Sequence, residues 1–305
     1  MPSPRNKTLS LSAEEESLYL RRCLTSPLPA AQLPLDRTIC GDCLQWMPRL
    51  PRAFADLVIA DPPYNLRKDF GGNVFEERSE AAYEAYTESW VSLLKPLMKD
   101  TASLYVCCDW RCSAAIERVL SRHFLVRSRI TWQREKGRGA ARNWKNAMED
   151  IWFATVSEDY TFHLDAVKQR RRVLAPYRED GHPKDWTESA DGRYRDTHPS
   201  NFWDDITVPY WSMPENTAHP TQKPEKLLSK LILASSSPGD TVFDPFLGSG
   251  STSVVAKKLG RHYLGIEQSE RYCSWAEARL EQAETDKRIQ GFEDGVFWER
   301  NSGKR

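Results

Sequence analysis

The chain alternates short apolar runs with stretches in which apolar residues recur every three or four positions. This alternation is typical of strands joined by helical crossovers. It predicts an α/β fold with a twisted, mostly parallel sheet and helices on both faces. The expected strands are residues 55–60, 103–108, 125–132, 150–155, 240–244 and 262–267. The expected helices contain the apolar stripe from Tyr83 to Leu97 and residues 223–236 and 251–259, the last ending at Gly260.

The periodicity is lost in the middle of the chain and at both ends. Between residues 160 and 215 the sequence is rich in Arg, Trp, Tyr, His and Pro, which favours an insertion over core. Residues 1–36 are expected to form an N-terminal extension with a short helix over 13–24, and residues 283–305 a polar C-terminal tail. One domain, residues 37–282, is therefore expected between the two ends.

Composition narrows the class of protein only in part. The 305 residues include 43 basic and 43 acidic side chains, so any nucleic-acid surface must be a local basic patch. No apolar run reaches the roughly 18 residues of a membrane span, and the first residues lack the apolar core of a signal peptide, so a cytoplasmic protein is expected. The seven cysteines and six histidines lack the spacing of a disulfide framework or a metal site, and we expect free thiols and no metal.

A glycine-rich turn follows the expected strand that ends at Asp244. A strand, a Gly248-Ser249-Gly250 turn and a helix together bring backbone N–H groups and a helix N-terminus up to a ligand. A structural turn before a helix would have the same sequence. The next strand ends at Glu267, about twenty positions beyond the turn, where folds of this kind hold ribose hydroxyls.

The chemistry of this loop favours a cationic ligand. The loop has no Gly-Lys-Ser/Thr phosphate clamp, and the Asp244 carboxylate would repel a pyrophosphate. S-adenosylmethionine carries an ammonium, a sulfonium and a ribose diol, and has no phosphate. It therefore fits the loop better than NAD or ATP.

The run Asp61-Pro62-Pro63-Tyr64 directly follows the strand at 55–60. An exocyclic amine on adenine or cytosine is a poor nucleophile because its lone pair is delocalised into the ring. The Asp61 carboxylate and the Pro62 carbonyl can each accept one N–H bond, which favours a pyramidal nitrogen that faces a methyl donor. Pro63 holds that carbonyl fixed, and Tyr64 offers a face on which a base can stack. The alternative is a proline-rich turn that ends a strand, with Tyr64 in the core.

Three segments occur along the chain in a fixed order, namely Asp61 to Asn65, His219 to Pro224 and Asp244 to Thr252. Together they resemble the β-class of DNA amino-methyltransferases, which are N6-adenine or N4-cytosine enzymes. The likeness covers most of residues 37–282, and the permuted order of catalytic motif, target-recognition region and cofactor loop is also that of the family. The resemblance implies a Rossmann-like methyltransferase fold, S-adenosylmethionine as cofactor and an inserted target-recognition region.

The resemblance also implies roles for individual residues. Asp61, Pro62, Pro63 and Tyr64 would form the catalytic motif that orients the amine and stacks on the flipped base. The residues expected to contact or border the cofactor are Asp42, His219, Thr221, Gln222, Lys223, Asp244, Phe246, Gly248, Ser249, Gly250, Ser251, Thr252 and Glu267. Two of these have simpler explanations, because Asp42 suits an ordinary turn and Thr221 suits the cap of the helix that follows.

A base inside a duplex is out of reach of such a site, so the enzyme must extrude its target or find it single-stranded. Phosphate contacts are expected from basic residues between the catalytic and cofactor motifs, where the family keeps its base-reading region. These are Arg134, Lys136, Arg138, Arg142, Lys145, Arg170, Arg171 and Arg172, with Trp186, Arg193, Tyr194, Arg195, Asn201 and Trp203 in the same region. The alternative is that these basic residues are simply solvated.

The predicted activity is methylation of adenine N6 at a short site in double-stranded DNA. The Asp at the start of the catalytic motif resembles the adenine branch, because the cytosine branch tends to begin with Ser; N4-cytosine methylation is the nearest alternative. RNA and protein-amide methyltransferases normally place the cofactor loop first, and a binding module without activity would not require Asp61. No membrane partner is expected, and the sequence leaves open a homodimer and a cognate restriction endonuclease.

Overall fold

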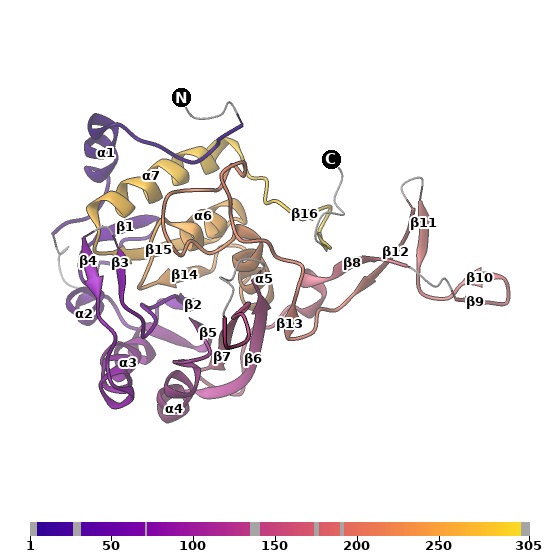
Figure 1. Cartoon of the computed structure of the whole chain (residues 1–305), viewed down its shortest axis with the longest axis horizontal. Coiled ribbons are helices and arrows are strands. Elements are labelled where there is room, and N and C mark those ends of the chain that lie inside the picture. The colour runs from indigo at the N-terminus through magenta and orange to yellow at the C-terminus, as the bar shows by residue number, and fades with distance from the viewer. Residues whose placement is uncertain are drawn as a thin grey trace.

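The computed structural model describes residues 5–26, 32–70, 72–134, 141–173, 177–189 and 192–299 of the chain. Within these residues the largest unit is a sheet of eight strands in the order β1-β15-β14-β2-β5-β7-β6-β13 (Figure 1). Neighbouring strands are parallel except where β7 pairs with β5 and β6, so the predicted α/β class is confirmed. The strands are β1 Arg37–Cys40, β2 Ala55–Ala60, β5 Met98–Cys108, β6 Leu125–Gln133, β7 Met148–Thr155, β13 Phe202–Trp203, β14 Thr241–Asp244 and β15 His262–Glu267.

The helices are α1 Ala13–Leu20, α2 Cys43–Trp46, α3 Glu80–Leu94, α4 Ser113–His123, α5 Glu225–Ser235, α6 Ser251–Lys258 and α7 Glu270–Thr285, with short 3-10 turns at Met47–Arg49, Lys95–Leu97 and Leu164–Val167. The predicted helices correspond to α1, α3, α5 and α6. Helices α2, α4 and α7 were not predicted. In α7, most of the buried side chains are small or polar, such as Cys273, Ala276 and Ala283. An apolar stripe of small residues is a weak signal in sequence.

The sheet is buried on both faces, which explains why its strands are continuous apolar runs. Successive residues of a strand point to opposite faces. In β2, Val58 and Ala60 pack in the core layer that includes side chains of α2, α3 and α4. Leu57 and Ile59 pack in the opposite layer with α5 and α6. Both layers hold the sheet rigid beneath the loops that follow its strands.

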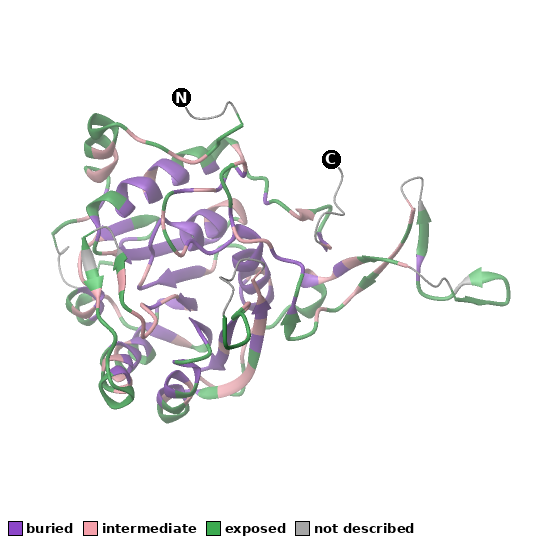
Figure 2. Cartoon of the chain, viewed as in Figure 1, coloured by how far each residue is buried: buried purple, intermediate pink, exposed green. Residues whose placement is uncertain are grey.

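A second sheet stands beside the first and extends into an arm. Its order is β11-β12-β8-β17-β16, so it combines the insertion with the end of the chain. Figure 1 shows β11, β12 and the β9–β10 hairpin reaching away from the body, and Figure 2 shows that this arm is largely exposed. The strands are β8 Gln169–Arg172, β9 Arg178–Glu179, β10 His182–Pro183, β11 Thr187–Ser189, β12 Gly192–Thr197, β16 Phe292–Glu293 and β17 Val296–Trp298, and a separate hairpin pairs β3 Lys68–Phe70 with β4 Asn73–Phe75.

Parts of the expected insertion and of the expected polar tail belong to the core. In the insertion, β13 joins the edge of the main sheet beside β6, and Trp203 and Ile206 are buried. In the tail, β17 pairs with β8 in parallel and Phe297 is fully buried. The expectation of a polar tail is therefore corrected for these residues, since a few large apolar side chains make the contacts without forming a periodic pattern. The division of the chain at residues 36 and 282 stays a prediction.

The N-terminal extension packs against the body. Helix α1 lies within the predicted helix over 13–24 and begins with a capping box between Ser12 and Glu15. It contacts α7, where the Tyr19 hydroxyl donates to Glu281 at 2.5 Å. Among the described residues, no helix has both the length and the apolar character that crossing a membrane requires.

Candidate active site

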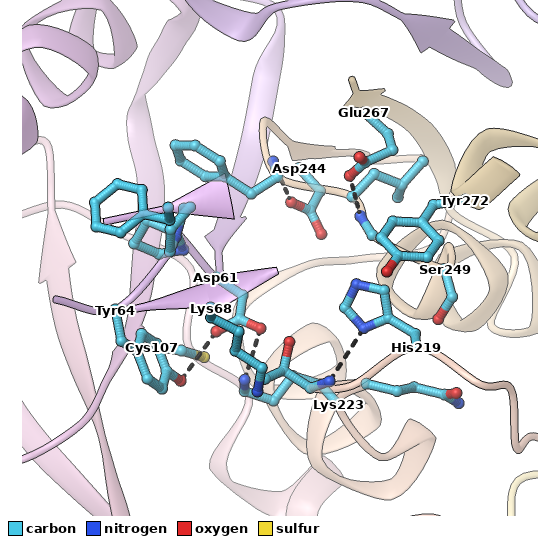
Figure 3. Close-up of a pocket in the computed structure, with 18 of the residues that line it drawn as sticks. Asp61, Tyr64, Lys68, Cys107, His219, Lys223, Asp244, Ser249, Glu267 and Tyr272 are labelled. Atoms are coloured by element: carbon cyan, nitrogen blue, oxygen red, sulfur yellow. Dashed lines mark hydrogen bonds and ion pairs between the residues drawn. The ribbon is translucent and has the colours of Figure 1, made fainter. Parts of the chain in front are cut away.

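The two predicted loops meet at one edge of the main sheet. Asp61 follows β2 and Asp244 ends β14, and these two strands are parallel neighbours. The carboxyl ends of adjacent parallel strands are where an open α/β sheet binds its ligands. A cavity of about 580 Å³ lies there, and residues of both loops line it. In Figure 3, Asp61 and Tyr64 lie on one side of this cavity, while Asp244 and Glu267 lie on the other.

Asp61 is held by two polar partners. Its Oδ2 atom lies 2.6 Å from Nζ of Lys223, and its Oδ1 atom accepts from the Tyr64 hydroxyl at 3.0 Å. Burial raises the pKa of Asp61, the neighbouring Lys223 ammonium opposes that rise, and the Glu149 carboxylate adds to it. Asp61 thus lies beside a cation that favours its charged form.

The proline turn is fixed from behind by α3. The Tyr83 hydroxyl donates to the Pro63 carbonyl at 3.1 Å, and Tyr83 is buried. Within the described residues, no donor reaches the Pro62 carbonyl, which is the acceptor predicted to share the amine with Asp61. The Tyr64 ring lines the cavity, and its hydroxyl also lies 3.0 Å from Oε2 of Glu149.

Glu149 is a site residue that the sequence analysis missed. It lies on β7 with its side chain 5% exposed, and its Oε1 atom is 2.5 Å from Nη1 of Arg134. Its Oε2 atom is 3.5 Å from Nζ of Lys223. The signal in the sequence was a pair of acids, Glu149 and Asp150, at the start of an apolar run. Lys68, Cys107 and Tyr272 also line the cavity and were not predicted.

The buried Asp244 carboxylate is held by neutral hydrogen-bond partners. Its Oδ1 atom accepts from the Phe246 backbone N–H at 2.9 Å, and it has a side-chain hydrogen bond with Thr252. Burial, the largest cause, raises its pKa to about 7. No ion pair joins it to Lys, Arg or His in the part of the chain that the structure describes. A buried carboxylate of this kind is suited to a cationic ligand.

The glycine turn works by close packing. Gly250 has a φ of 87°, and a Cβ atom there would lie 2.6 Å from Cβ of Ala276 on α7. Gly248 has a φ of 56°, and its Cβ would lie 3.1 Å from the His219 ring. From below, Arg279 donates to the Ser249 carbonyl at 2.8 Å and to the Ser251 hydroxyl at 2.9 Å. The turn is therefore pressed between α7 and His219, at the N-terminus of α6.

Glu267 braces the same turn from the next strand. One of its oxygens accepts from the Gly248 N–H at 2.9 Å and the other from the Ser269 N–H at 2.8 Å. Burial raises its pKa, and these two hydrogen bonds oppose the rise. It lines the cavity, so its remaining lone pairs are available to a diol.

The segment from His219 to Lys223 closes the cavity from a third side. Gln222 accepts from the Thr217 hydroxyl at 2.7 Å and donates to the Glu215 carbonyl at 2.6 Å, so its side chain fixes the loop. His219 packs edge-on against Tyr272, with ring centroids 4.5 Å apart, and burial lowers its pKa to about 3. A neutral imidazole therefore faces the turn.

The proposed cap at Thr221 is wrong. Helix α5 has Pro224 at its N-cap position and begins at Glu225. The Glu225 N–H is instead satisfied by the Glu215 carboxylate at 2.7 Å. A side chain ten residues away performs the capping, which local sequence could not reveal.

Most of the predicted cofactor residues line the cavity, namely His219, Thr221, Gln222, Lys223, Asp244, Phe246, Gly248, Ser249, Ser251, Thr252 and Glu267. Asp42 and Gly250 are not among the lining residues of the described chain. Asp42 caps α2 by accepting from the Leu44 N–H at 2.9 Å, while its neighbour Gly41 lines the cavity.

The predicted basic residues fall into three groups. Arg134 points at Glu149 and lines the cavity. Arg142 and Lys145 are exposed, whereas Lys136 and Arg138 lie outside the described residues. On β8, Arg170 forms a bidentate pair with Asp196 at 2.7 and 2.8 Å, Arg171 lies 3.9 Å from Glu299, and Arg172 is exposed. Trp186 and Trp203 are buried, and Arg193 and Arg195 pair with Glu188 and Asp185.

Comparison with known proteins shows the family to which this chain belongs. A family model described as DNA methylase, covering N6 and N4 methyltransferases, matches residues 55–278. The Type II methyltransferase M.HpaI of Haemophilus parainfluenzae is 31% identical over 248 residues, which are 80% of this chain and 74% of that protein. The DNA adenine methyltransferase YhdJ of Escherichia coli K12 is 32% identical over 252 residues, 80% of this chain and 82% of that protein.

A solved structure has the same fold. The crystal structure of M1.HpyAVI in complex with SAM aligns with a TM-score of 0.52 and 24% identity, and the match covers 80% of this chain and 98% of that one. The fold and the paired loops define a Rossmann-like methyltransferase. The chain belongs to the N6/N4 DNA methylase family, and it is a DNA methyltransferase.

Proposed function

We propose that this enzyme transfers a methyl group from S-adenosylmethionine to N6 of adenine in a short double-stranded DNA sequence, after the base is flipped. The observation that carries the proposal is the placement of Asp61 and Asp244. They end neighbouring strands and border one cavity, so an amine acceptor and a cation acceptor lie together. YhdJ, named a DNA adenine methyltransferase, supports adenine as the target.

The cofactor side of the cavity fits S-adenosylmethionine. Asp244 is a buried carboxylate without a cationic partner among the described residues, and it suits the cofactor's ammonium. Glu267 suits the ribose hydroxyls, and the turn between Gly248 and Gly250 allows a close approach to the backbone. When bound, the cofactor supplies a methyl group on a cationic sulfur, which is already activated for displacement.

The catalytic side of the cavity acts by orienting the amine of the target base. The Asp61 carboxylate and the Pro62 carbonyl each accept one N–H of the amine, so the nitrogen lone pair turns out of the ring plane and towards the methyl carbon. The bound cofactor would supply the methyl group, with the electron pair of its carbon–sulfur bond left on sulfur, and the amine would give up one proton as its new nitrogen–carbon bond forms. Tyr64 stacks on the flipped base and Tyr83 keeps the proline turn in place.

Sequencing of modified bases tests the proposal directly. DNA from a methylation-free host that expresses this chain should carry N6-methyladenine at every copy of one short motif. N4-methylcytosine instead would assign the enzyme to the cytosine branch of the family. Unmodified DNA, with purified protein that still binds S-adenosylmethionine, would overturn the DNA substrate and turn attention to RNA or protein amides.

Three finer predictions belong to this proposal. The enzyme acts in the cytoplasm, where bacterial DNA is found. Light scattering of the purified protein at several concentrations tests a homodimer. Protection of methylated DNA from host nuclease extracts tests a cognate restriction endonuclease.

A further inference from the structure

Four charged side chains gather on the catalytic side of the cavity. Lys223 lies 2.6 Å from Asp61 and 3.5 Å from Glu149, and Arg134 lies 2.5 Å from Glu149. The side chains of Lys223 and Glu149 are only 7% and 5% exposed. Two cations and two carboxylates therefore balance in a place where water screens them little.

Lys223 lines the cavity, as the family resemblance implies, but its ammonium lies against the catalytic motif. The resemblance assigns it to the border of the cofactor pocket, but both carboxylates near its ammonium belong to Asp61 and Glu149. On the cofactor side, Asp244 forms no ion pair with Lys223 or any other cation in the described part of the chain. The contact with Asp61 joins residues 162 positions apart, so the fold has brought the lysine specifically to the catalytic motif.

We propose that Lys223 is a positioning residue for methyl transfer, whose ammonium keeps the Asp61 carboxylate ionised and directs Oδ1 towards the target amine. The Glu149 carboxylate, which Arg134 holds in place, also attracts the Lys223 ammonium and so weakens its effect on Asp61. The inference rests on the proposed function, in which Asp61 accepts an N–H bond. It goes beyond that function by giving Lys223 and Glu149 opposite influences on one carboxylate.

The physical reason is that only an ionised carboxylate presents acceptors alone. A protonated Asp61 would present an O–H donor to the amine and could not hold it in the reactive orientation. Burial raises the pKa of Asp61, and Lys223 is the largest influence that lowers it. The groups that face Asp61 are Lys223 from the segment before α5, Glu149 on β7, Tyr64 on its own loop, Cys107 on β5, Lys68 on β3 and Asp244 on β14.

The test compares the pH dependence of kcat in four variants. Lys223→Met removes the charge at similar side-chain length. The acid limb of the kcat profile, which is the fall of kcat at low pH, should then move to a pH about 1–3 units higher, because an adjacent opposite charge usually shifts a pKa by that amount. Lys223→Arg keeps the charge and should restore most of the wild-type limb. Glu149→Gln removes the competing carboxylate and should move the limb down. Lys258→Met is the matched control, because Lys258 also lies 2.6 Å from a carboxylate, that of Glu225, but outside this cavity; its limb should match wild type.

A second measurement separates the two roles of Lys223. Calorimetric titration at pH 8 should give Lys223→Met an affinity for S-adenosylmethionine within about threefold of wild type, because the lysine contacts the catalytic carboxylate. The inference is overturned if affinity falls tenfold or more while the acid limb stays in place, which would make Lys223 a cofactor ligand. It is also overturned if Lys223→Met and Glu149→Gln move the limb in the same direction.

The outcomes separate this inference from the proposed function. If wild-type enzyme methylates no DNA base, the proposed function has failed before any variant is compared. If wild type is active and the limbs do not move, the function stands and the role of Lys223 falls. Glu149→Gln retains Lys223 and Arg134, so it provides a second test if Lys223→Met does not fold.

Discussion

Asp61 and Asp244 lie at the ends of neighbouring strands and border the same cavity, yet the electrostatic surroundings of their carboxylates differ. Asp61 has a lysine 2.6 Å away. Asp244 has hydrogen-bond donors but no cationic partner among the described residues, and burial raises its pKa to about 7. Among the described residues, Asp61 therefore has a counterion and Asp244 has none, and the proposed function rests on this difference. Under the proposed function, the acid that must be charged when the substrate arrives has its own counterion, and the acid that binds the cationic cofactor does not.

The largest effect should come from removing Asp61, the carboxylate that has a lysine partner. Asp61→Ala should lower kcat by roughly 10²–10³-fold, the range seen when one oriented transition-state contact is lost. Affinity for S-adenosylmethionine should change little, because Asp244 and Glu267 are untouched. Single-turnover methylation and calorimetry measure the two quantities. Equal losses in kcat and in cofactor affinity would show that Asp61 and Asp244 do not have separate roles in catalysis and cofactor binding.

Removing the other acid should reverse the pattern. Asp244→Asn keeps the hydrogen-bond acceptor but not the charge, and it should weaken S-adenosylmethionine binding by roughly 10- to 100-fold, as expected for a hydrogen bond to a charged group. At saturating cofactor, kcat should fall much less than in Asp61→Ala. A normal affinity in this variant would mean that the ammonium binds elsewhere.

The turn behind Asp244 can be perturbed without touching either acid. Gly250 and Gly239 have φ values of 87° and 86°, so alanine strains both backbones alike. At Gly239 a Cβ atom would meet nothing within 4 Å, whereas at Gly250 it would lie 2.7 Å from the Ala276 backbone. Gly250→Ala should therefore lower the free energy of unfolding by about 1–3 kcal/mol more than Gly239→Ala in a urea titration. Equal losses would show that the turn has room to move away from α7.

The raised pKa of Asp244 predicts how cofactor affinity depends on pH. Below about pH 7 the carboxylate takes up a proton and loses the charge that pairs with an ammonium. The Kd for S-adenosylmethionine should therefore rise by up to about tenfold per pH unit between pH 7 and 5.5 and level off above pH 8. Asp244→Asn should remove most of this slope. A slope that persists in the variant would have to come from another group.

The smallest effect is expected at the DNA surface. Arg142 is exposed, whereas Arg170 already forms a bidentate pair with Asp196. Arg142→Ala should weaken DNA binding by a few-fold and reduce the salt slope by about one, and Arg170→Ala should do less. Fluorescence anisotropy at several salt concentrations measures both. A larger loss at Arg170 would show that DNA displaces Asp196.

The sheet and the two loops could be predicted because their causes are local. Strands buried on both faces need apolar runs, and Asp61 and Asp244 each follow such a run directly. What could not be predicted depends on distant partners. Glu149 and Lys223 acquire their roles only when β7 and the segment before α5 meet the loop after β2.

The basic residues also show that sequence does not reveal partners that lie far away along the chain. Sequence identified Arg134 and Arg170 as phosphate contacts because of their charge, but it could not show that each already has a carboxylate partner. The tail was misjudged for a related reason. Phe297 and its neighbours are few and lack a period, and their burial depends on β8, far back in the chain.

The pairing of β17 with β8 has a consequence for exchanging the proposed target-recognition arm between relatives. The arm is fastened by two pieces of chain, residues 169–172 and 296–298, which are separated by the whole cofactor half of the protein. A chimera that receives only the middle segment of a relative would join a foreign β8 to the resident β17 at a buried contact. A workable graft carries both segments together, because the structural unit that holds the arm is discontinuous in sequence.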